Sequence, residues 1–281
     1  MENAGTTPNF LVIGAAKCGT TALCALLGRH PEVFVHPRKE LNFFSFDEKY
    51  AEGFDAYREA FTDAGAAVAI GEGSPSYAKR AKRPDAAARI AKHLPHARLI
   101  YIVRHPLRRM ESAWLHARRS DHRTEATFAE TVRQVPEYVD TSDYDRQLAA
   151  YADHFPAEQL KVLFFEDFVA DATTTLCETF RFLGVDETQE IPLDRAPSNP
   201  SLGRKADPPL LKRVKRSKAF KALDRMSPSL ANAATKPFQR ALNERPNWDK
   251  GTLEFVRGRL EDGVRGFLRG QGKDEDYWGW E

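Results

Sequence analysis

The feature that most constrains this chain is a short apolar run that leads through a loop of small residues directly into a helix. Residues 10–14 (FLVIG) are apolar and end in glycine, and residues 22–29 (ALCALLGR) follow Thr20 and Thr21, whose hydroxyls suit the start of a helix. A strand, a tight loop and a helix in this order are typical of folds in which helices cover a parallel sheet. We therefore expect a strand–loop–helix unit here.

Strand and helix patterns go on alternating along the chain. Further strands are expected at residues 31–35, 67–70, 99–103 and 160–165, and helices near residues 85–93, 107–119, 142–154 and 250–268. Continuous apolar runs favour strands that are covered on both faces. The pattern predicts an α/β fold in a single domain over residues 1–281, with a central parallel β-sheet flanked by helices and residues 1–9 as a tail.

Composition narrows the class of protein. Lys and Arg number 42 against 40 Asp and Glu, a formal net charge of +2, which argues against a general polyanion binder. The cysteines, Cys18, Cys24 and Cys177, are too few for a disulfide framework and suit a reducing compartment. Neither a signal peptide pattern nor a run of about 18 apolar residues is visible. We expect a cytoplasmic protein without stable membrane insertion.

The loop between the first strand and helix has the composition of an anion cradle. Residues 14–21 (GAAKCGTT) combine small residues, one lysine and two hydroxyls just before a helix N-terminus, where free N–H groups attract phosphate or sulfate. A Walker A loop would place lysine after its last glycine, whereas Lys17 precedes Gly19, so an ordinary ATPase or GTPase is disfavoured. For this loop alone, a turn that serves only tight packing remains the alternative.

A second anion site is expected after the strand at residues 99–103. Arg104 stands at the strand end, where ligands of α/β sheets bind, and Pro106 suits the first turn of the next helix. Ser112 lies about two helical turns further on. A guanidinium and a hydroxyl could close on one phosphate if this helix packs against the strand end.

Four segments in this order resemble the sulfotransferase family that uses 3'-phosphoadenosine 5'-phosphosulfate (PAPS): FLVIGAAKCGTT, HPRKELNFF, GEGSPSY and LIYIVRHPLRRMESAWLHAR. Within the family, the chain is nearest to the heparan sulfate (glycosaminoglycan) type and its bacterial relatives. The resemblance is strong over residues 10–119, moderate through LKVLFFEDF and loose from residue 191 on. It implies a P-loop-like sulfotransferase fold and transfer of a sulfuryl group from PAPS to a hydroxyl, or an amine, of a small-molecule or saccharide acceptor.

The resemblance also implies which residues hold the donor. The 3'-phosphate would lie on Arg104 and Ser112, so that both anion sites inferred from chemistry would bind the same nucleotide. Arg204 resembles part of a late segment that closes over the donor, within residues 191–221. The 5'-phosphosulfate would lie on the loop residues Lys17, Cys18, Gly19, Thr20 and Thr21.

Sulfuryl transfer needs a base for the acceptor proton and donors or cations for the developing charge. Glu40 matches the family's catalytic base, Lys39 could tune it or contact the sulfuryl oxygens, and Lys17 would lie near the bridging oxygen. The alternative is that Lys39 and Glu40 form only a charge pair on the surface. His36 is the second candidate for the base. No metal is required, because the leaving group is a phosphate ester with cationic partners.

Two residues depart from the family pattern. Asn42 stands where a histidine is frequent, which puts acceptor contacts at this position in doubt. Gly73 stands where the glycosaminoglycan type often carries a lysine, and its loss suggests an acceptor that is less anionic than heparan sulfate or a base arrangement that relies on Lys39. For the neighbouring Glu72, a role near the donor and a buried structural carboxylate are equally open.

Two other functions are alternatives for this sequence. A P-loop small-molecule kinase would need ATP and magnesium, and a non-enzymatic nucleic-acid-binding protein would use the basic residues 212–221, for which a solvated helix face is the simpler interpretation. Neither explains both anion sites. The C-terminal aromatics (YWGW) would line an acceptor cleft or, as aromatics more often do, belong to the core. We expect no nucleic-acid partner and infer nothing about the oligomeric state.

Overall fold

A computed structural model describes residues 6–38, 40–119, 126–193, 205–206, 240–241 and 245–280. Its central sheet has five parallel strands in the order β2-β3-β1-β4-β5. These strands are β1 (Phe10–Gly14), β2 (Val33–Val35), β3 (Ala69–Gly73), β4 (Arg98–Val103) and β5 (Leu160–Phe164). The predicted α/β fold with a single domain and a parallel sheet is confirmed.

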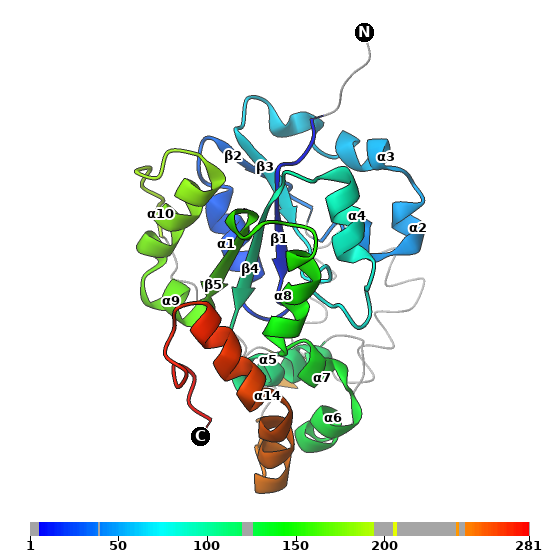
Figure 1. Cartoon of the computed structure of the whole chain (residues 1–281), viewed down its shortest axis with the longest axis vertical. Coiled ribbons are helices and arrows are strands. Elements are labelled where there is room, and N and C mark those ends of the chain that lie inside the picture. Colours follow the sequence, from blue (N-terminus) through cyan, green and yellow to red (C-terminus); the bar gives the residue numbers. More distant parts are fainter. Residues whose placement is uncertain are drawn as a thin grey trace.

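Helices cover both faces of the sheet. Helices α4 (Ala86–His93) and α8 (Tyr144–Ala152) lie over one face, and α1 (Thr20–Leu27) and α10 (Ala172–Leu183) lie over the other (Figure 1). All five residues of β1 are buried, as expected for a strand between two helical layers. The core therefore lies on both sides of β1 and β4.

The carboxyl ends of the strands point toward the end of the molecule where three helices gather, namely α5 (Pro106–Arg119), α7 (Glu137–Asp140) and α14 (Lys250–Gly270) (Figure 1). Smaller helices complete the described chain: α2 (Asp47–Tyr50), α3 (Phe54–Glu59), α6 (Phe128–Gln134), α9 (Phe165–Ala170), η1 (Phe43–Ser45), η2 (Thr62–Ala64) and η3 (Ala157–Gln159). A short antiparallel pair joins β6 (Lys205–Ala206) to β7 (Arg240–Ala241).

Strand β3 differs from its expected bounds. It runs to Gly73, so the first residues of GEGSPSY belong to the strand and not to a loop. Gly71 pairs with Phe10 of β1, and a Cβ atom there would come within 2.1 Å of the Phe10 carbonyl oxygen. Glycine in this strand allows close approach of two backbones, and the strand continues three residues beyond its expected end at residue 70.

The C-terminal part of the chain closes over the strand ends. Asp249 caps α14 by accepting a hydrogen bond from the Thr252 amide, and the buried residues of this helix recur every three or four positions, which gives it one packed face. Trp278 and Trp280 are 2% and 5% exposed, so these aromatics belong to the core. None of the helices in the described part of the chain is long and apolar enough to cross a membrane.

Candidate functional site

The loop after β1, predicted to be an anion cradle, leads into α1 through a left-handed glycine. It ends at Gly19, the N-cap of α1, which has a φ of 93° and carries no side chain that could cap the helix. A Cβ atom at Gly19 would lie 2.6 Å from the ring of Phe165, so both the conformation and the space require glycine. Lys17 also has a positive φ, of 74°. The amide end of α1 is thus left open toward the loop.

Cys18 turns away from this opening. Its thiol is fully buried, with Sγ 3.9 Å from the hydroxyl of Tyr144, and burial raises its pKa to about 12. The Cys18 amide donates to the Ala15 carbonyl at 3.2 Å. The side chain of Cys18 therefore helps to hold the loop on the core, and the place of Cys18 among the donor-binding residues stays a prediction.

Phe165 brings the second predicted anion site to the first. The guanidinium of Arg104, at the end of β4, lies 4.8 Å from the centre of the Phe165 ring. The same ring lies against Gly19 of the loop at residues 14–21, here called the donor loop because it is the one predicted to hold the 5'-phosphosulfate. Arg104 is 7% exposed, and burial lowers its pKa. Ser112, also 7% exposed, lies on α5, the helix that follows. Phe165 was not among the predicted site residues, because its link to the loop depends on the pairing of β4 with β5.

His105, which directly follows Arg104, is held by the C-terminal segment. Its Nε2 lies 2.7 Å from the carbonyl of Gly279, and its Nδ1 accepts a hydrogen bond from the Leu107 amide. Its own amide donates to Glu166, which also accepts from the indole of Trp278. Hydrogen bonds thus join His105 to the C-terminal segment and occupy both of its ring nitrogens, which makes it unsuited to be a base.

Glu40, the predicted base, lies on the segment between β2 and η1. Its side chain is exposed and its backbone has a φ of 59°. The second candidate, His36, accepts a hydrogen bond from the Arg38 amide on Nδ1 and packs against the ring of Phe61, so it supports the turn. Lys39 and Arg204 lie outside the described residues, as do residues 212–221, and their roles stay predictions.

Two further carboxylates near the site are unsuited to be the base. Glu72 is 0% exposed and accepts hydrogen bonds from Tyr77 and Ser74. Burial raises its pKa to about 7, although these hydrogen bonds lower it, and no acceptor can reach it. Of the two interpretations left open for Glu72, the buried structural one is correct. Burial opposes ionisation of Glu137 as well, but hydrogen bonds from Lys79 and Lys82 lower its pKa to about 2, which makes it a poor base.

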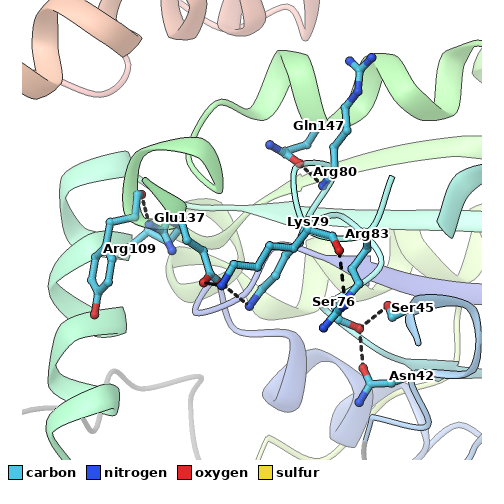
Figure 2. A network of polar contacts seen from close by, with 11 residues as sticks. Asn42, Ser45, Ser76, Lys79, Arg80, Arg83, Arg109, Glu137 and Gln147 are labelled. Carbon is cyan, nitrogen blue, oxygen red and sulfur yellow. Dashed lines mark hydrogen bonds and ion pairs between the residues drawn. The ribbon is translucent and has the colours of Figure 1, made fainter. Parts of the chain in front are cut away.

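Lys17 lines a cavity of about 400 Å³, here called the lysine cavity, which Glu137 and its two lysine partners also line. Among its walls are Lys17, Lys79, Lys82, Arg109, His116 and Glu137. Figure 2 shows Lys79 beside Glu137, with which its amino group pairs at 2.7 Å. The amino group of Lys82 pairs with the other carboxylate oxygen of Glu137. The Arg109 guanidinium is buried and donates to Ser142 Oγ and the Tyr138 carbonyl. Lys79 and Lys82 follow GEGSPSY closely in the sequence, but Glu137 gave no signal there.

A second cavity, of about 370 Å³, is lined by Thr20, Thr21 and Cys24 of α1, by His36 after β2 and by Gly73 at the end of β3. Its lining residues differ from those of the lysine cavity, which includes Ala16 and Lys17 of the loop before α1.

A family model described as the sulfotransferase domain matches residues 7–198. The chain belongs to the sulfotransferase family. All the described site residues lie inside this match, whereas Arg204 and the C-terminal segment lie beyond it.

Two comparisons give the degree of likeness. Over 189 residues the chain is 28% identical to mouse heparan sulfate glucosamine 3-O-sulfotransferase 5, in an alignment that covers 63% of this chain and 54% of that protein. The crystal structure of a sulfotransferase from Alicyclobacillus acidocaldarius has a TM-score of 0.61 and 28% identity, and covers 82% of this chain and 96% of that one.

A mouse sulfotransferase complexed with PAP has a TM-score of 0.52 at 14% identity, covers 94% of this chain and 86% of that one, and shares the fold. The chain spans about half the length, or less, of the first curated sulfotransferases that it matches.

Proposed function

We propose that this sulfotransferase moves the sulfuryl group of PAPS to a hydroxyl, or an amine, of a small-molecule or saccharide acceptor. The observation that carries the proposal is the ring of Phe165, which contacts Gly19 of the donor loop and Arg104 of the second anion site. PAPS carries anionic groups at both its 5' and 3' positions, so it needs two adjoining cation sites. A mouse sulfotransferase of the same fold is complexed with PAP, the product that PAPS leaves after transfer.

In this proposal the donor loop holds the 5'-phosphosulfate. The open N-terminus of α1, with the hydroxyls of Thr20 and Thr21, surrounds the anion, and Lys17 stabilises the charge that develops on the leaving oxygen. Arg104 and Ser112 take the 3'-phosphate. Phe165 keeps the planar guanidinium of Arg104 oriented while leaving its edge available for two parallel hydrogen bonds.

Glu40 is the base of the proposed reaction. The acceptor oxygen attacks sulfur as its proton passes to the Glu40 carboxylate, and the bond between sulfur and the bridging oxygen breaks, leaving PAP with the electron pair. The exposure of Glu40 suits this role, because Glu72 is inaccessible and Glu137 is held ionised by two lysines. The reaction as written uses no metal.

We assign the lysine cavity to the acceptor, because Lys17 is shared between it and the donor loop. The similar mouse protein is named for heparan sulfate glucosamine, which favours a saccharide. A cytoplasmic location stays a prediction. A small-molecule kinase is disfavoured, since Lys17 precedes the loop glycine and Arg104 suits a 3'-phosphate that ATP lacks.

Calorimetric titration tests the donor assignment. PAP should bind without magnesium and more tightly than 5'-AMP, which lacks the 3'-phosphate. Arg104→Ala should weaken PAP binding about 10- to 100-fold while changing 5'-AMP binding little, because only the 3'-phosphate loses its charged partner. Magnesium-dependent binding of ATP, with PAP no tighter than 5'-AMP, would overturn the proposal.

A further inference from the structure

The segment that carries Glu40 has an unusual backbone. Glu40 and Asn42 have φ angles of 59° and 57°, in the left-handed region that side chains other than asparagine, aspartate and glycine rarely adopt. The Glu40 side chain is exposed, and the direction in which it leaves the chain follows from this backbone conformation. Such a conformation persists only where neighbouring contacts hold it.

Asn42 supplies those contacts with both ends of its carboxamide. Its Nδ2 donates to the backbone carbonyl of Glu40 at 2.8 Å, and its Oδ1 accepts a hydrogen bond from Ser76. Ser76 is held in turn by the buried hydroxyl of Ser45, 2.7 Å away. Figure 2 shows Ser76 between Asn42 and Ser45, which lie on one segment, while Ser76 comes from the segment after β3.

The Asn42 backbone is tied to the core by a separate route. Its amide donates to Ser74 Oγ at 2.9 Å, and this hydroxyl donates to the Glu72 carboxylate at 2.7 Å. Tyr77 donates to the other carboxylate oxygen at 2.6 Å. Ser74 and Glu72 are 0% exposed, so the Glu40 segment is anchored to the buried end of β3.

We propose that Asn42, held by Ser76 and Ser74, is a positioning residue that sets the backbone of Glu40 and thereby aims the catalytic base. The inference rests on the proposed function of Glu40. The proposal gives a physical reason for asparagine at position 42, where the family frequently has a histidine. The asparagine carboxamide joins the Glu40 carbonyl to the GEGSPSY segment. The proposal also gives the buried Glu72 a part in the site without any contact with a substrate.

The test compares variants by the rate at which PAP is released from PAPS with glucosamine as the acceptor probe. Asn42→Ala should lower kcat about 10- to 100-fold, because a small displacement of a base costs that much, and should leave the Kd of PAP within about twofold. Asn42→Gly should lose a similar factor, since glycine accepts the left-handed φ but makes no side-chain hydrogen bond. Ser76→Ala should be impaired, and Ser76→Thr should retain most of the activity because it keeps the hydroxyl.

A double variant separates positioning from general stability. If Asn42 acts through Glu40, adding Asn42→Ala to Glu40→Gln should cost less than about twofold in kcat, whereas independent effects would multiply. Asn9→Ala is the matched control, because Asn9 also bridges backbone groups, donating to Val68 and accepting from the Ile70 amide, but at the opposite end of β3. It should lower Tm and leave kcat unchanged.

Two results overturn the inference: Asn42→Ala with a kcat within twofold of the wild type, or a loss that multiplies with that of Glu40→Gln. Failure of the proposed function would look different, because the wild type would then release no PAP or Glu40→Gln would turn over like the wild type.

Discussion

Gly19 shows how one residue can decide whether the donor loop forms. Its φ of 93° disfavours any side chain, and the ring of Phe165 fills the space where a Cβ atom would stand. Gly19→Ala should therefore weaken PAP binding more than tenfold and lower Tm, because the loop, the ring or both must move. Calorimetric titration and thermal unfolding measure these effects.

Gly258→Ala is the control for the Gly19 prediction. Gly258 lies within α14 and a Cβ atom there would meet nothing within 4 Å. Alanine should stabilise the helix by about 1 kcal/mol and leave PAP binding unchanged. If Gly19→Ala bound PAP as tightly as Gly258→Ala does, the donor loop would not need this glycine.

At the scale of elements, the contact between β3 and α1 explains a second departure from the family. A Cβ atom at Gly73 would lie 2.5 Å from the Sγ of Cys24 on α1, so the lysine that the resemblance places at this position does not fit beside that thiol. The two residues form a matched pair across the strand and the helix. Packing against Cys24 thus opposes any longer side chain at Gly73, and the amino groups of Lys79 and Lys82 in the following segment pair with Glu137.

A double-mutant cycle tests this pairing. Gly73→Ala alone should destabilise the protein by about 1–3 kcal/mol, the usual range for overpacking, and the cost should fall by at least half in a Cys24→Ala background. Urea unfolding of the four proteins gives the coupling energy. Equal costs in both backgrounds would mean that the thiol moves aside freely and that Gly73 is not constrained by α1.

Contacts between elements that are neighbours in the sequence could be predicted. Contacts between elements that only the sheet brings together could not. The donor loop and its glycine follow from residues 10–29, because one strand and one helix define them. Phe165 gave no such signal, since it reaches Gly19 only through the order β1-β4-β5 in the sheet. In the sequence, Asn42 is only a departure from the family pattern, because its hydrogen-bond partner Ser76 is 34 residues away.

At the scale of the whole molecule, the C-terminal segment joins the site from outside the family match. Lys273 and Tyr277 bind Asp167, and Trp278 donates to Glu166. These acidic residues directly follow Phe165 and belong to α9. The sequence suggested that YWGW belongs to the core, but the side chains it contacts depend on how α14 returns over the strand ends. A segment that begins more than 70 residues after the end of the family match thus helps to hold α9, the helix that starts at Phe165.

The free energy of unfolding should depend on pH because Glu72 is buried. Its pKa of about 7 in the folded protein exceeds the ordinary value of 4.5, so folding takes up a proton between these pH values. The free energy of unfolding contributed by this group therefore falls as pH rises from 4.5 to 7. Between pH 5.5 and pH 7 the fall is about 2 kcal/mol.

Glu72→Gln removes this titration while keeping an oxygen for Tyr77 and a polar atom for Ser74. In urea unfolding at pH 5.5, 6.5 and 7.5, the variant should gain about 2 kcal/mol relative to the wild type as pH rises. Glu137→Gln is the control, because the folded pKa of Glu137 is about 2 and its contribution is constant over that range. A constant difference between Glu72→Gln and the wild type would mean that Glu72 stays ionised in the fold, and a permanent charge at the end of β3 would then adjoin the Glu40 segment.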